Sequence, residues 1–179
     1  MDIRNTIDLL ESSKEKLEQV KLHYNHSALG PVMSSNTVDY HYGKLYKGYV
    51  DRYNKGEGDK TFNEAGAYLH SIFFSQFRSP GGRAPKGTIL TLIQRNHKNF
   101  VDFKRIFKEE AMKIQGSGWI YLSKSGQIRT IRNHAKRTDI ALLVDMWEHA
   151  FNLDYKSNKS KYLDNIWRIM DWDEINKRL

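Results

Sequence analysis

The chain contains no cysteine among its 179 residues. This absence excludes disulfides, zinc–thiolate sites, iron–sulfur clusters and cysteine nucleophiles, so any metal must be held by histidine and carboxylate side chains. No apolar run approaches the length of a membrane span, and the acidic segment 1–18 lacks the apolar core of a secretory signal. We therefore expect a cytoplasmic protein with no membrane partner.

The composition is that of a folded protein with an excess of positive charge. Apolar residues make up 39% and aromatic residues 12% of the chain, which suffices for a packed interior. The formal net charge of +8 suits nucleic acid, an anionic surface or a small anionic substrate. Because the charges are interspersed and form no basic block, we expect no nucleic-acid partner.

Breaks in the sequence predict an N-terminal extension followed by two sub-domains that share one core. An imperfect apolar stripe predicts a helix over residues 2–21, within an extension that covers 1–22. Two helices, from Ser34–Ser35 onward and over 62–77, are separated by a Gly-rich break and predict a helical hairpin domain over 23–78. The Pro- and Gly-rich segment 79–85 marks the boundary with a C-terminal domain over 79–179.

The C-terminal domain changes from helical to strand-like periodicity. Residues 119–122, 127–132 and 140–144 predict short strands, with a hairpin turn at Ser125–Gly126, and helices precede and follow them. The predicted fold class is therefore α+β: an N-terminal antiparallel helical hairpin followed by a C-terminal α/β domain with a three-stranded antiparallel sheet.

Three histidines and one aspartate lie in predicted apolar surroundings. His41 and His70 fall on the apolar faces of the two hairpin helices, and Asp145 and His149 follow the buried strand 140–144. Taken singly, each has a simpler interpretation as a satisfied core histidine or a helix-capping aspartate. Taken together, three imidazoles and a carboxylate suit manganese or iron, and also zinc.

Several short motifs resemble those of one known family, in the same order and at similar distances. They are Tyr40-His41-Tyr42-Gly43-Lys44, Gly116-Ser117-Gly118-Trp119, Asp145-Met146-Trp147-Glu148-His149-Ala150 and Asp154-Tyr155. With these motifs the chain resembles the iron/manganese superoxide dismutases from about residue 23 to residue 179.

The resemblance implies that superoxide is disproportionated to dioxygen and hydrogen peroxide at a mononuclear centre. It implies one Mn or Fe ion per chain, with manganese slightly favoured. By the resemblance, His41, His70, Asp145 and His149 are the metal ligands, a water or hydroxide completes the coordination, and Tyr49 lies at the mouth of the substrate funnel.

Further roles follow from the same resemblance. Trp119, Trp147 and Phe74 are expected to form an apolar shell around the metal. Glu148 is expected to cross the interface of a homodimer and bond to His149 of the partner subunit, which would fix the orientation of that ring.

The sequence departs from the family pattern at positions that matter for the interface and the proton relay. Leu45 stands where many members have His, and Asn152 stands where many have Tyr. The polar partner of the bound solvent is usually a Gln, but the helix position for it is Gly66. We assign this partner to His134, while its simpler interpretation is an exposed loop residue.

Two other functions fit parts of the sequence. The added N-terminal segment and the lost interface residues would permit a non-enzymatic structural member of the same fold, recruited into a larger assembly. An iron-dependent oxygenase or a zinc hydrolase would also use histidine and carboxylate ligands. Retention of all four candidate ligands favours the dismutase.

Overall fold

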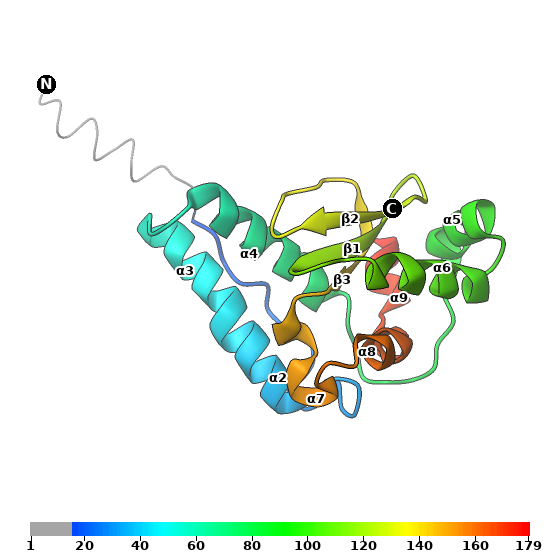
Figure 1. Cartoon of the computed structure of the whole chain (residues 1–179), viewed down its shortest axis with the longest axis horizontal. Coiled ribbons are helices and arrows are strands. Elements are labelled where there is room, and N and C mark those ends of the chain that lie inside the picture. The colour runs from blue at the N-terminus through cyan, green and yellow to red at the C-terminus, as the bar shows by residue number, and fades with distance from the viewer. Residues whose placement is uncertain (1–15) are drawn as a thin grey trace, which may run out of the picture.

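The computed structural model describes residues 16–179 and shows a helical hairpin packed against a domain built on a small sheet (Figure 1). The hairpin and the sheet meet where α4 lies against β3. The predicted fold class is confirmed. Within these residues, no helix is both long and apolar enough to cross a bilayer.

The first arm of the hairpin runs through three consecutive helical elements. These are α2 (Ser35–Tyr40), the π-helix η1 (His41–Tyr46) and α3 (Lys47–Lys55). The arm begins at Ser34, whose hydroxyl accepts from the backbone N–H of Thr37, and ends at Gly56 in the left-handed conformation. The second arm is α4 (Lys60–Ser75), which begins at the capping side chain of Asp59.

The π-helical turn changes which side chain of the first arm faces the core. A regular α-helix would place Leu45 on the same face as His41, and the sequence pattern predicts this. In the structure Leu45 is only half-buried, whereas Tyr46, five residues after His41, is fully buried. Five residues is the hydrogen-bond spacing of a π-helix, as the bond from the Lys47 N–H to the Tyr42 carbonyl shows.

The segment that precedes the hairpin is not helical where the structure describes it. The helix predicted over residues 2–21 is wrong for 16–21, and its remainder lies outside the described residues. Instead the segment lies along the hairpin, and side chains of the first arm satisfy its backbone. Asn54 bonds to both backbone groups of Leu17, and Val20 donates to the Tyr46 hydroxyl and accepts from Tyr42.

The sheet has the strand order β2-β1-β3 and is antiparallel throughout. Its strands are β1 (Gly118–Ser123), β2 (Ile128–Arg132) and β3 (Ile140–Asp145). All residues of β1 and β3 are buried. The register pairs Trp119 with Asp145, which places an indole of the central strand beside the end of β3. The other elements of this domain are α5 (Gly87–His97), α6 (Phe100–Met112), η2 (Glu148–Ala150), α7 (Asn152–Tyr155), α8 (Lys159–Asn165), η3 (Ile166–Ile169) and α9 (Trp172–Asn176).

A buried glutamine at the end of α4 fastens this helix to the edge of the sheet. The Gln76 amide donates to the Leu143 carbonyl and accepts from the Leu143 N–H, as a neighbouring strand would. Arg178 bonds to the Ala141 carbonyl and to Gln76, and so covers the same edge. This attachment fixes α4 relative to β3, and each of the two carries a residue of the site below.

Candidate metal centre

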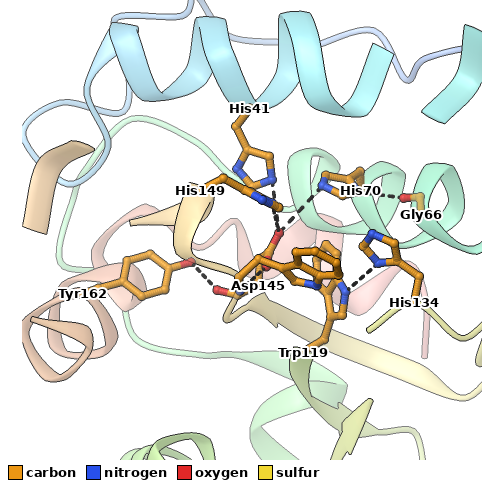
Figure 2. A network of polar contacts seen from close by, with 9 residues as sticks. His41, Gly66, His70, Trp119, His134, Asp145, His149 and Tyr162 are labelled. Atoms are coloured by element: carbon orange, nitrogen blue, oxygen red, sulfur yellow. Dashed lines mark hydrogen bonds and ion pairs between the residues drawn. The ribbon is translucent and has the colours of Figure 1, made fainter. Parts of the chain in front are cut away.

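Four polar side chains converge at the junction of the hairpin and the sheet (Figure 2). His41 comes from η1, His70 from the middle of α4, Asp145 from the end of β3 and His149 from η2. One donor atom from each lies within 4.8 Å of the others. The first three side chains are fully buried, and His149 is half-buried.

One carboxylate oxygen of Asp145 faces all three imidazoles. Oδ2 lies 3.1 Å from Nε2 of His41, 3.2 Å from Nε2 of His149 and 3.7 Å from Nε2 of His70. The other oxygen, Oδ1, accepts from the backbone N–H of Trp147 at 2.8 Å. The Nε2 atoms of His41 and His70 are buried without a hydrogen-bond partner among residues 16–179. Buried polar atoms are normally paired, so this cluster needs a further group that binds nitrogen lone pairs.

The hydrogen bond on the far side of His70 fixes its tautomer. Nδ1 lies 2.7 Å from the carbonyl oxygen of Gly66, one turn earlier on α4. Because a carbonyl oxygen can only accept, Nδ1 carries the proton and Nε2 presents its lone pair to Asp145. This is the arrangement by which proteins orient a histidine that binds a metal.

Burial keeps the imidazoles of His41 and His70 neutral. Burial lowers the pKa of His41 to about 4 and holds the pKa of His70 well below its ordinary value. Burial by itself would raise the pKa of Asp145, but the adjacent His149 and His41 hold it below its usual range. Neutral imidazoles and an ionised carboxylate are the protonation states in which these groups coordinate a cation.

Comparison with known proteins matches both parts of the chain. The model for the iron/manganese superoxide dismutase C-terminal domain matches residues 85–178, and the model for the alpha-hairpin domain of the same enzymes matches residues 16–61. The chain belongs to the iron/manganese superoxide dismutase family.

Individual relatives agree over most of their length. A superoxide dismutase [Fe] of Bacteroides fragilis is 34% identical over 90% of this chain and 98% of the relative. A superoxide dismutase [Mn/Fe] of Porphyromonas gingivalis matches at the same identity and coverage. A superoxide dismutase [Fe] of Escherichia coli is 30% identical over 88% of this chain and 95% of the relative. The names of these superoxide dismutases include both metals.

An aromatic wall surrounds the four side chains in this family member. The predicted shell residues Trp119 and Phe74 are fully buried, and their rings lie 5.0 Å from the His70 ring and 4.9 Å from the His41 ring. The ring of Trp147 lies 5.5 Å from that of His149. Such a wall limits access to small species and lowers the local dielectric.

His134 is part of this wall and is not an exposed loop residue. It is 8% exposed and stacks on Trp147 at 4.6 Å, while the Tyr49 ring lies 4.8 Å away. Trp119 donates to its Nδ1 at 3.1 Å, so the proton of the neutral ring is on Nε2. That Nε2 is buried and has no partner among the described side chains and backbone groups.

Gly66 leaves the space that Tyr49 and His134 fill. A Cβ at this position would stand 2.9 Å from the Tyr49 ring and 3.2 Å from Cδ2 of His134. The sequence shows that Gly66 offers no polar side chain, and the structure adds that two rings require its small size.

Glu148 lies apart from the cluster within its own chain. It is exposed, and its carboxylate makes no ion pair or hydrogen bond with any residue in the described range. Asn152, which stands where many members of the family have Tyr, and Gln115 are also exposed.

Two tyrosines, to which the sequence alone assigns no role at the site, complete the centre. Tyr46 stacks on His70 with the ring planes 17° apart, and the Tyr162 hydroxyl donates to the backbone carbonyl of Asp145 at 3.0 Å. The burial of Tyr46 depends on the π-helical turn. Tyr162 lies seventeen positions beyond Asp145, and no local spacing predicts that contact.

Proposed function

We propose that this chain disproportionates superoxide with one iron or manganese ion held by His41, His70, Asp145 and His149. The overall reaction converts two superoxide anions and two protons to dioxygen and hydrogen peroxide. The observation that supports this most directly is a set of buried imidazole nitrogens around an ionised carboxylate, which have no hydrogen-bond partner among residues 16–179. When bound there, iron or manganese supplies the one-electron oxidation and reduction that the reaction needs. The family makes the chain an oxidoreductase, and a purely structural subunit would have no need for this set of ligands.

Metal loading with a superoxide assay tests this function directly. The metal-free protein, prepared with a chelator, should be inactive, and manganese or iron at one ion per chain should restore superoxide removal. Zinc is the matched control, because it fits the same ligands but has no redox chemistry, so zinc-loaded protein should stay inactive. If the zinc-loaded and metal-free forms were as active as the manganese-loaded form, the proposal would be contradicted.

The ligands and the aromatic wall have different roles at the site: the ligands set its charge, and the wall excludes water. Asp145 contributes the one negative charge among the four ligands, which only partly balances a cation, so the centre keeps a net positive charge. A positive centre favours an anionic substrate, and the rings of Trp119, Trp147 and Phe74 exclude water that would screen it.

We further propose that His134 holds solvent at the centre. Its Nε2–H is a buried donor that has no partner in the part of the chain that the structure describes. Burial lowers the pKa of His134 to about 4, so the ring is neutral near pH 7. Tyr49, whose phenol pKa burial raises to about 12, contacts the same ring and completes the polar lining. These two groups can orient a water molecule, with the Nε2–H of His134 donating a hydrogen bond to the water oxygen.

Replacing His134 with alanine should leave the metal bound and lower turnover by about ten- to a hundredfold, the usual cost of removing an outer partner. Metal content, steady-state rate and the redox potential of the centre would be measured together. His134→Gln should recover part of the rate, because an amide can accept from Trp119 and donate to solvent. The exposed His23 supplies the control variant, His23→Ala, which should match the parent. Unchanged rate and potential in His134→Ala would assign His134 a packing role only.

We also propose a two-fold homodimer built on the surface around Glu148. This carboxylate is exposed beside the half-buried His149, and Leu153 nearby is 52% exposed. An isologous contact would cover these side chains and let Glu148 bond to His149 of the partner subunit.

Glu148→Ala should therefore loosen the dimer and weaken metal retention by about tenfold, as loss of a hydrogen bond to a ligand does. Light scattering across a dilution series and competition with a chelator measure the two effects. Glu109→Ala, on the exposed face of α6, is the control and should change neither. A parent protein that is monomeric and fully active at micromolar concentration would rule out this interface.

Manganese is the slightly favoured metal in this proposal. A solvent partner carried by a loop, with Gly66 and Phe73 on the helix, resembles the manganese-type pattern more than the iron-type one. Activity per bound ion, measured after separate loading with each metal, tests the preference. Higher activity with iron would reverse it.

A further inference from the structure

Arg52 on α3 lies over the ring of Tyr49. The two residues are three positions apart, so they are neighbours on one helix face. The guanidinium carbon Cζ stands 4.9 Å from the centre of the Tyr49 ring. The same ring lies 5.3 Å from that of His70 and 4.8 Å from that of His134. A cation therefore sits one aromatic ring away from the candidate metal centre.

The structure holds this guanidinium in place. Its Nε donates to Oδ1 of Asn63 at 3.1 Å, and Asn63 is 3% exposed and donates in turn to the Glu57 carbonyl at 2.9 Å. Gly48 leaves room for it, because a Cβ there would stand 3.0 Å from Nη1 of Arg52. A long side chain that is fixed on three sides loses little freedom when it meets a ligand.

Arg52 also keeps its charge available, whereas two cations of the segments that carry Tyr49 and His134 are paired with carboxylates. Lys47 pairs with Asp51, and Lys136 pairs with Glu64 at 2.9 Å. Arg52 meets only a neutral amide and an aromatic face, and within residues 16–179 its Nη1 and Nη2 groups make no ion pair or hydrogen bond. Several N–H donors are therefore free to meet an anion.

We propose that Arg52, above Tyr49, is an anion-recruiting site that draws small monovalent anions toward the centre. Superoxide is the anion in the reaction, so this inference rests on the proposed function, and azide is a stable probe of the same charge and similar size. A fixed cation beside a low-dielectric aromatic wall raises the local concentration of anions and the rate of their entry. Screening by salt should weaken this effect.

The test compares Arg52→Gln with Arg95→Gln in the metal-loaded protein. Arg95 is exposed on α5, a helix of the other domain that lies well away from α3 in Figure 1, so the two variants change net charge equally. Azide affinity by calorimetry and kcat/KM for superoxide are measured at low and high ionic strength. For Arg52→Gln we expect about fivefold weaker azide binding and about fivefold lower kcat/KM at low salt, with the difference shrinking at high salt. Arg95→Gln should bind azide as the parent does, and Arg52→Lys should be intermediate.

A second variant serves if Arg52→Gln fails to fold or to hold metal. Gly48→Ala keeps the positive charge, suits a helix interior and displaces the guanidinium, so it should also weaken azide binding. The proposal would be overturned if Arg52→Gln, or this second variant, showed the same azide affinity and the same salt dependence as Arg95→Gln. A parent protein that binds azide in an Arg52-dependent way but does not remove superoxide would instead contradict the proposed function and leave the anion site standing.

Discussion

Replacing Asp145 with alanine is expected to abolish metal binding and superoxide removal together. Asp145 is the only anionic donor among the four candidate ligands, and its Oδ2 faces all three imidazoles. Loss of a mere outer partner of a ligand typically costs 10- to 100-fold in metal affinity, so loss of the carboxylate itself should cost more than about a hundredfold. Metal content by elemental analysis should fall from about one ion per chain to nearly none, with activity falling in proportion.

A buried carboxylate elsewhere provides the matched control. Asp171 is 9% exposed and caps α9 by accepting from the N–H groups of Asp173 and Glu174. Asp171→Ala should lower the free energy of unfolding by about 1 kcal/mol, the usual cost of a lost cap, and should keep both metal and activity. Asp145→Ala leaves the Trp147 N–H without its acceptor, a comparable cost, so the two variants differ mainly in metal. Full metal occupancy in Asp145→Ala would remove Asp145 from the ligand set.

Local sequence signals predict the sheet and the four converging residues well. The apolar run that predicts β3 and the predicted turn at Ser125–Gly126 each lie within a few residues of the observed strand and turn. Because Asp145 and His149 follow this strand closely, the sequence also predicts that both lie at the same strand end. His41 and His70 could be predicted because each lies on the apolar face of its helix, and the structure buries both completely.

Features that depend on distant contacts could not be predicted in this way. Tyr46 replaces Leu45 in the core because its hydroxyl meets the backbone of Val20, twenty-six residues earlier. That contact also makes residues 16–21 a packed segment without helix, although their composition allows one. From the sequence alone, Gly66 is only a glycine that weakens its helix. The structure shows that the rings of Tyr49 and His134 fill the space beside it. In each case the observed conformation depends on a contact with a residue that lies outside the local sequence pattern.

The metal-free protein is expected to lose stability steeply between pH 6.5 and pH 4.5. Burial lowers the pKa of His41 and of His134 to about 4 and that of His70 well below its ordinary value, whereas an unfolded chain has histidines with a pKa near 6.5. In this window the unfolded state therefore binds more protons than the folded state, and stability falls as the pH falls. His41 and His134 should each contribute about 2 kcal/mol over the window, and His70 should add to the loss in the same direction.

Asp145 acts in a different pH range. Its pKa is held below the usual value, so the stability that it contributes is present above the unfolded pKa near 4 and is lost only at lower pH. Urea unfolding of metal-free protein at several pH values measures the slope. His134→Leu should remove about 2 kcal/mol of the loss. His23→Leu, at an exposed position, should leave the curve unchanged. A free energy of unfolding that is the same at pH 6.5 and pH 4.5 would show that these imidazoles take up protons in the folded chain as they do in the unfolded chain. The neutral donor set on which metal binding rests would then be wrong.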